Sequence, residues 1–252
     1  MAVGGRAPSP LAPGLYVVST PVGNLEDVTL RALRTLSGVE AIYAEDTRTT
    51  AALLSRYGVR TPLRAFHAHN ESAREAGVLS RLAAGASLAL VSDAGTPLLS
   101  DPGALLAAAA ARAGHAVFAV PGASALLAGL VVSGLPTRAV TFAGFLPAPP
   151  AQRRRRLKQL AAALRDATLA LYVPPHKLAA TLADAAAALG PERRCCVARE
   201  LTKMHEEAWR STLAEAAAEF AQRCVLSSTQ SVTCSPWTDS LVPATAGVLA
   251  AR

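Results

Sequence analysis

The stretch Val91-Ser-Asp-Ala-Gly-Thr-Pro-Leu-Leu-Ser-Asp-Pro-Gly103 is the most informative part of this chain. The apolar run Ser87–Ser92 predicts a buried strand that ends at Asp93, and a helix is expected to begin near Asp101. The loop between them offers backbone N–H groups and a carboxylate at the carboxyl end of a strand, where open α/β sheets bind ligands. Because it contains no lysine or arginine, this loop suits ribose hydroxyls or a positive centre better than a phosphate.

The composition indicates a globular, basic protein. The 252 residues, 51% of them hydrophobic, are enough for one large domain or two of about 100–130 residues each. A net charge of +7 favours a polyanionic partner, with arginine-rich coding as the alternative explanation. The four cysteines show no zinc-ligand spacing and no disulfide pattern, so we expect no metal and a reducing compartment. We also expect neither a signal peptide nor a membrane span, because no long apolar run is present.

Strand-like and helix-like segments alternate along the chain, which predicts an α/β fold with a mostly parallel sheet. Asp27 and Asn70 are the expected caps of two of the helices. We predict a flexible N-terminus (1–13), an N-terminal α/β domain (14–121), a C-terminal α/β domain (122–220) and an atypical tail (221–252). The tail is rich in Ser and Thr and shows no clear period, which predicts loop or disorder.

Two short polar segments follow predicted strands of the first domain. In Glu45-Asp-Thr-Arg48, two carboxylates and an arginine would lie beside a substrate, or Asp46 or Thr47 would simply cap the next helix. The pair His67 and His69 lacks a third ligand at helical spacing, which disfavours a metal. Surface histidines and a role in substrate or proton handling remain the alternatives for this pair.

Two further segments lie in the predicted second domain. The basic run 153–158 crowds a helix start, where cations oppose the helix dipole. An RNA backbone would explain it, and a solvated helix face is the alternative. The polar segment Ala198–Glu207 follows a predicted buried strand and is either a functional loop or a loop of ion pairs.

Taken together, these motifs resemble one family. The strings STPVGNLEDVTLRAL, YAEDTRTT, PLRAFHAHNE, LVSDAGTPLLSDPG, VPGASA, SGLPT, FAGFLP and VARELTKMHEE occur in this order between Pro13 and Ala218. They are similar to the small-subunit ribosomal RNA (cytidine-2′-O)-methyltransferases, the RNA-modifying branch of the tetrapyrrole methylase superfamily.

The resemblance implies two α/β domains with S-adenosylmethionine in the cleft between them, a homodimer, and the 16S rRNA of the small ribosomal subunit as substrate. It implies methylation of the ribose of a decoding-centre cytidine, in the cytoplasm or, for a eukaryotic source, an organelle. The implied cofactor-binding residues are Pro21, Val22, Gly23, Asn24, Asp93, Ala94, Gly95, Thr96, Pro97, Ser100, Asp101, Ser124, Ala198 and Leu201. The candidate catalytic residues are Glu45, Asp46, His67, His69 and Lys203. The candidate RNA-binding residues are Arg48, Arg153, Arg154, Arg155, Arg156 and Lys158.

The chain departs from the family pattern at two places. Val173-Pro-Pro-His-Lys177 stands where the family usually carries Glu-Ser-Pro-His-Arg, so a cofactor contact at Val173–Pro174 is in doubt. The family's last buried strand has no counterpart in Ala221–Arg252, so we expect the second sheet to lack a strand. A tetrapyrrole methyltransferase and an inactive RNA-binding protein are the alternative functions.

Overall fold

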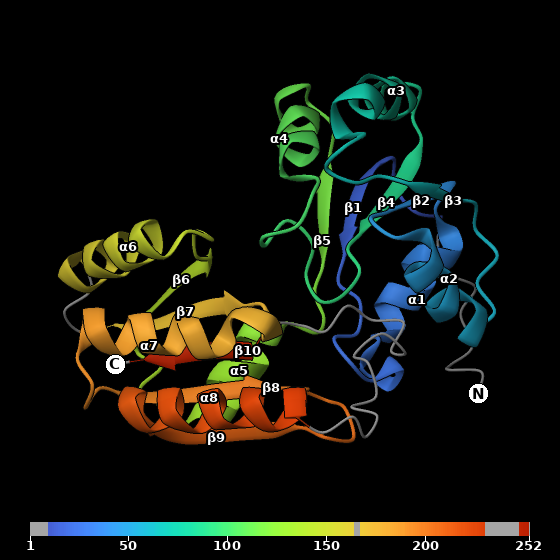
Figure 1. The fold of residues 1–252 in the computed structure, drawn as a ribbon. Coiled ribbons are helices and arrows are strands. Elements are labelled where there is room, and N and C mark those ends of the chain that lie inside the picture. The colour runs from blue at the N-terminus through green and yellow to red at the C-terminus, as the bar shows by residue number, and fades with distance from the viewer. Residues whose placement is uncertain (1–9, 164–166, 230–246, 252) are drawn as a thin grey trace. The chain divides into compact units, whose positions relative to one another are not determined.

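The computed structural model describes residues 10–163, 167–229 and 247–251. The chain forms two compact units, of which the first comprises the chain up to Pro21 together with Leu25–Ala123. The second comprises Val22–Asn24 and the chain from Ser124 onward. Within the described residues each unit has one five-stranded sheet with its own apolar core (Figure 1).

The first unit is an open parallel α/β sheet. Its elements are β1 (Gly14–Val18), the 3-10 turn η1 (Leu25–Asp27), α1 (Leu30–Gly38), β2 (Ala41–Ala44), α2 (Thr47–Arg56), β3 (Leu63–Ala65), α3 (Glu71–Ala83), β4 (Ser87–Val91), α4 (Ala104–Arg112) and β5 (Val117–Val120). The strands lie in the order β3-β2-β4-β1-β5, and every pair is parallel. The central strands β1, β2 and β4 are buried along their whole length, as expected of continuous apolar runs in a parallel sheet.

Side chains that alternate along each strand supply two separate cores. Leu15 and Leu88 pack with α3 and α4 on one face, and Tyr16 and Ala89 pack with α1 and α2 on the other (Figure 1). The helices that follow the neighbouring strands β1 and β4 therefore lie on opposite faces. Their carboxyl ends mark a topological switch point, the place where open α/β sheets bind ligands.

Local capping differs from the sequence prediction at two helices. Thr29, not Asp27, caps α1, and its Oγ1 accepts from the Ala32 N–H over 3.0 Å. The chain first makes the short turn Leu25–Asp27, which moves the start of the helix forward. Asn70 occupies the N-cap position of α3, but its Oδ1 turns back to accept from the His67 N–H over 2.8 Å.

The second unit has a mixed sheet. Its elements are α5 (Ala125–Ser133), β6 (Val140–Phe145), α6 (Pro150–Ala163), β7 (Thr168–Val173), η2 (Pro175–Lys177), α7 (Leu178–Leu189), β8 (Arg194–Arg199), β9 (Glu207–Thr212), α8 (Leu213–Thr229) and β10 (Gly247–Ala251). The strand order is β6-β7-β10-β8-β9, and only β6 and β7 are parallel neighbours. The prediction of a mostly parallel sheet thus holds for the first unit alone.

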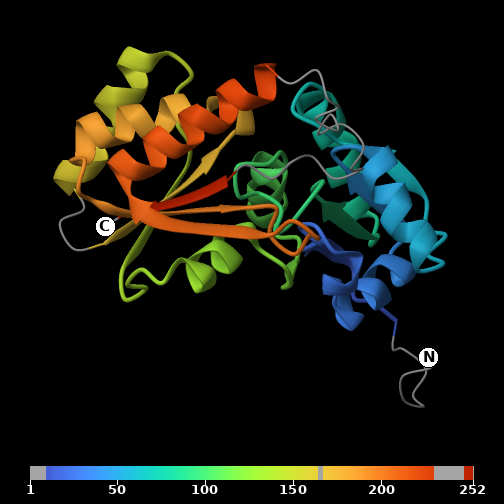
Figure 2. The same ribbon diagram turned by 60° about the horizontal axis from the view of Figure 1, so that its bottom comes forward.

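Helices cover both faces of this second sheet. Leu157 of α6, Leu182 of α7 and Phe220 of α8 belong to one core with Leu171 and Val197 of the sheet. On the opposite face, α5 packs on β8, β9 and β10, and Figure 2 shows it below the strands.

The C-terminal part of the chain differs from the predicted tail in two described stretches. Helix α8 continues through residues 221–229, and β10 pairs antiparallel with β7 on one side and β8 on the other. The expectation of a missing strand is therefore wrong. Strand β10 fills a central position, where it satisfies backbone groups of both neighbours that would otherwise be buried without partners. Strand β9, whose residues are at most partly buried, was not predicted from the sequence.

Candidate active site

In the first unit, the loops after β1 and β4 are held together by paired backbone hydrogen bonds. The Thr20 N–H donates to the Gly95 carbonyl over 2.9 Å, and the Gly95 N–H donates back over 3.0 Å. The hydroxyls of Ser19 and Thr96 lie 3.0 Å apart, and the Thr96 Oγ1 also donates to the Ala123 carbonyl. The switch point of the sheet is thus a fixed platform that includes the predicted cofactor residues Gly95 and Thr96.

Unfavourable backbone conformations concentrate in the two loops that the motifs identified. Among the described residues, the non-glycine positions with positive φ are Leu98 (74°), Ser100 (74°), Glu200 (51°) and Thr202 (64°). The first two follow β4, and the last two follow β8. Such conformations cost about 1–3 kcal/mol each and cluster at ligand sites, which supports a functional role for both loops.

Three carboxyl groups gather at the carboxyl ends of β2 and β4, and we call Glu45, Asp93 and Asp101 the carboxylate cluster. Burial, followed by the charges of Asp93 and Asp101, raises the pKa of Glu45 to about 7. Burial is also the main cause that raises the pKa of Asp101 to about 6 and that of Asp93 above its ordinary value. A cluster of this kind suits a cationic ligand, and Glu45 is a proton acceptor matched to neutral pH.

Asp46 and Arg48 form a separate pair at the start of α2. The Asp46 Oδ1 accepts from the Arg48 N–H over 2.8 Å, which caps the helix, and the guanidinium of Arg48 pairs with Asp46 at 2.7 Å. The hydrogen bond from Arg48 is the main cause that lowers the pKa of Asp46 to about 2. The Asp46 side chain is therefore a helix cap and a poor base near neutral pH. The backbone N–H of Asp46 donates to Asp93 Oδ1 over 2.8 Å and positions the Asp93 carboxylate.

The two histidines follow β3. His67 is half-buried, its Nε2 lies 3.1 Å from the Asn70 Nδ2, and its buried Nδ1 has no hydrogen-bond partner among the described residues. His69 is exposed, and the two rings are 6.0 Å apart. Within the described part of the chain, no three His, Cys, Asp or Glu side chains gather as metal ligands.

In the second unit, Gly23 packs tightly on the loop after β8. A Cβ atom at Gly23 would lie 2.6 Å from both the Leu201 carbonyl oxygen and the Lys203 Cγ. The same Cβ would be 2.9 Å from the Thr202 Oγ1, which is buried and without a hydrogen-bond partner in the described structure. Thr202 was not singled out from the sequence, and its orphaned hydroxyl inside the ARELTK string makes it a candidate ligand contact.

The other predicted residues of the second unit have mixed environments. Lys203 Nζ pairs with Glu200 Oε1 at 3.3 Å, so this candidate is partly neutralised. Ala198 and Leu201 are buried. The Ser124 Oγ accepts from the Leu127 N–H at 3.5 Å and caps α5.

The basic run on α6 divides into structural and exposed side chains. Arg153 is buried, and its guanidinium pairs with Asp184 at 2.6 Å and donates to the Ala148 carbonyl over 3.0 Å. Arg154 pairs with the other oxygen of Asp184 at 2.9 Å. These contacts fasten α6 to α7. Arg154 is nevertheless exposed, as are Arg155, Arg156 and Lys158.

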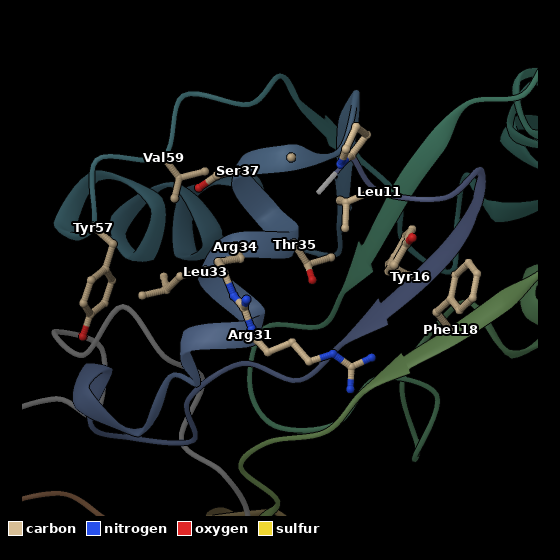
Figure 3. Close-up of a pocket in the computed structure, with 12 residues that line it drawn as sticks. Leu11, Tyr16, Arg31, Leu33, Arg34, Thr35, Ser37, Tyr57, Val59 and Phe118 are labelled. Carbon is tan, nitrogen blue, oxygen red and sulfur yellow. The ribbon is translucent and has the colours of Figure 1, made fainter. Parts of the chain in front are cut away.

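The first unit also contains a groove that lies apart from the candidate site residues described above. It has a volume of about 710 Å³ and runs beside α1, from which Arg31 reaches toward the stacked rings of Tyr16 and Phe118 (Figure 3). None of its lining residues belongs to the predicted sites.

No helix among the described residues has the length and apolar character needed to span a membrane.

Comparison with known proteins gives concordant matches. Residues 14–217 match the family described as Tetrapyrrole (Corrin/Porphyrin) Methylases. The "Ribosomal RNA small subunit methyltransferase I" of Synechocystis sp. is 49% identical over 208 residues, which are 82% of this chain and 74% of that protein. The protein of the same name from Xylella fastidiosa (strain Temecula1) is 52% identical over 200 residues, with 79% and 72% covered.

The fold also has solved counterparts. The structure of a uroporphyrin-III C-methyl transferase from Thermus thermophilus complexed with S-adenyl homocysteine matches with a TM-score of 0.58. The match covers 82% of this chain and 91% of that chain at 20% sequence identity, a level at which the likeness concerns the fold.

Proposed function

This chain belongs to the tetrapyrrole methylase family and, within it, to the ribosomal RNA small subunit methyltransferase I proteins, and we propose that it methylates 16S rRNA with S-adenosylmethionine as donor. We further propose that the acceptor is the ribose 2′-oxygen of a decoding-centre cytidine. The observation that carries the proposal is the carboxylate cluster at the switch point of the first sheet, with Glu45 at a pKa of about 7.

The residues present fit the proposed cofactor. When bound, S-adenosylmethionine supplies a methyl group already activated by the adjacent sulfonium. The carboxylate cluster offers negative charge to the positive groups of this molecule. The loop Asp93–Pro97 adds backbone groups close to the end of β4.

The protein's main tasks are alignment and proton transfer. In-line displacement needs the attacking oxygen and the methyl carbon held about 3–3.5 Å apart, which rigid loops can enforce. Glu45 would accept the proton of the ribose hydroxyl, because a base with a pKa near the working pH is the most effective. Asp46 would hold Asp93 in place through its N–H, and Arg48 would reach a phosphate.

The RNA substrate is supported by the names of the relatives and by the exposed cations of α6, which suit an RNA backbone.

We also propose that the protein acts as a homodimer in the cytoplasm. Light scattering of the purified protein and fractionation of the source cells test these two points.

The decisive experiment is methyl transfer from labelled S-adenosylmethionine to small ribosomal subunits that lack the modification, mapped by mass spectrometry. Label on one cytidine ribose, with the adjacent linkage resistant to alkali, is the expected result. Label on a base, or on an added tetrapyrrole instead of RNA, would contradict the proposal. RNA binding by a folded protein without any transfer would identify an inactive binder.

Glu45→Gln tests the base within the same assay. The wild-type kcat/KM is expected to rise with pH up to about 7, because it reports the free enzyme, in which only the ionised Glu45 carboxylate accepts a proton. The amide variant should lose about 10²–10⁴-fold in kcat and lose this pH dependence, while S-adenosylmethionine still binds. An unchanged rate and pH profile would assign the proton to another group.

A further inference from the structure

A small pocket lies at the carboxyl ends of the parallel neighbours β6 and β7. It has a volume of about 150 Å³, and its lining includes Phe145, Tyr172, Pro174 and the basic residues Arg153 and Lys177. Within the part of the chain that the structure describes, no acidic side chain lines it. A cavity of about this size with apolar walls can hold one benzene ring.

The wall of the pocket is a cluster of aromatic rings. The Tyr172 ring lies 4.8 Å from the Phe142 ring and 5.6 Å from the Phe145 ring, measured between centroids. Phe145 is 51% exposed even though it packs against Tyr172. The exposed ring is therefore held by its neighbours and presents a preformed flat surface.

The charge around this ring cluster is positive. Arg153 is held by Asp184 and Ala148, so it shapes the pocket and is not free to bind a phosphate. Lys177 also lines the pocket. The pocket therefore combines an aromatic surface with a cationic side chain.

We propose that this pocket binds one unpaired base of single-stranded RNA, which stacks on the exposed ring of Phe145 with its edge against Tyr172 and has its flanking phosphate near Lys177. Aromatic rings beside cationic side chains are the combination that proteins use for unstacked RNA bases. The inference rests on the proposed function, because it specifies how the RNA substrate is held. It also gives a role to Val173-Pro174, which stands where the family usually has Glu-Ser and leaves the pocket without a carboxylate.

The test measures binding of a fluorescently labelled single-stranded RNA oligonucleotide to the full chain by anisotropy at several salt concentrations. Phe145→Leu keeps an apolar side chain and removes the flat ring, so the Kd should rise about 5- to 100-fold. Phe145→Trp keeps a stacking surface and should bind as tightly as the wild type. Val131→Ala, an exposed apolar residue on α5, is the matched control and should change nothing.

Salt dependence separates stacking from charge. Lys177→Gln should reduce the slope of log K against log salt by about 0.7, the contribution of one phosphate contact on a single strand. Phe145→Leu should weaken binding without changing that slope. A duplex RNA of the same sequence should not distinguish Phe145→Leu from the wild type, because its bases are not available for stacking.

The outcomes keep the two proposals apart. If wild type and Phe145→Leu bind single strands equally and methylate small subunits equally, the stacking site is wrong and the proposed function stands. If neither protein transfers methyl groups to RNA but Phe145→Leu still weakens single-strand binding, the proposed function is wrong and the stacking site stands. Equal loss of binding in the Leu and Trp variants would also overturn the stacking site, because it would indicate a packing role.

Discussion

Replacing Glu45 by glutamine should stabilise the protein at high pH and leave its stability at low pH almost unchanged. In the folded protein, burial and the neighbouring Asp93 and Asp101 raise the pKa of Glu45 from 4.5 to about 7. A carboxyl with a raised pKa binds its proton more tightly in the folded state than in the unfolded state. The favourable contribution of Glu45 to the free energy of unfolding is complete below pH 4.5 and is lost as the pH rises to about 7.

The size of the effect follows from the two pKa values. Their difference of about 2.5 corresponds to at most about 3.4 kcal/mol, since one pKa unit equals about 1.36 kcal/mol. Glu45 is only half-buried, so solvent screening reduces the expected gain to about 1–2 kcal/mol. Glutamine keeps the shape of the side chain and removes the negative charge that Asp93 and Asp101 repel.

Urea denaturation at about pH 4 and pH 8 measures the free energy of unfolding of wild type and variant. Glu45→Gln should match the wild type at the lower pH and exceed it at the higher pH. Glu192→Gln, a change of an exposed glutamate in the second unit, is the control and should have the same small effect at both. A Glu45→Gln variant that is less stable at pH 8, or whose difference from wild type does not vary with pH, would refute the proposed repulsion within the carboxylate cluster.

Three further predictions concern the other parts of the site. Gly23→Ala places a Cβ 2.6 Å from the Leu201 carbonyl oxygen, which forces the loop after β8 to shift. The variant should bind S-adenosylmethionine at least about tenfold more weakly by calorimetry and should have a lower unfolding midpoint than the wild type. Arg153→Met leaves the buried Asp184 with only the partly exposed Arg154 and should lower the free energy of unfolding by about 3 kcal/mol in urea denaturation, and an unchanged free energy would contradict the structural role of this ion pair. Binding of S-adenosylmethionine at about pH 6.5 should release protons, because a bound cation lowers the pKa values of the carboxylate cluster. Calorimetry in two buffers of different ionisation enthalpy measures the number of protons released. Proton uptake, or no proton exchange, would place the positive groups of S-adenosylmethionine away from the carboxylate cluster.

Most elements of the first unit could be predicted from local sequence. Strands β1, β2 and β4 are almost entirely apolar because parallel strands are covered on both faces, and each is followed by a turn that contains Gly or Asp. The second unit was harder. Strand β9 carries charged and polar residues, since it is an edge strand with partly buried side chains. The alternation of apolar and polar residues that marks a strand is therefore weak in this segment.

The C-terminal strand shows the limit most clearly. Gly247–Ala251 is five residues long, and nothing local distinguishes it from an apolar loop. It becomes a strand because β7 and β8 leave a gap between them whose backbone groups need partners. Such pairing joins segments about 50 or more residues apart, beyond the reach of any local pattern.

The sequence by itself determined the α/β class, the family resemblance and the loops that hold the candidate site, because these depend on hydrophobic period, turn residues and the order of motifs. Only the tertiary structure decided the state of individual side chains. It separated Glu45, whose pKa is raised by burial and neighbouring charge, from Asp46, whose pKa is lowered by Arg48, although the two are adjacent in the chain. It likewise made Arg153 a buried partner of Asp184 and left Arg155 exposed. Burial and charge proximity arise from contacts between distant segments, and local sequence does not specify them.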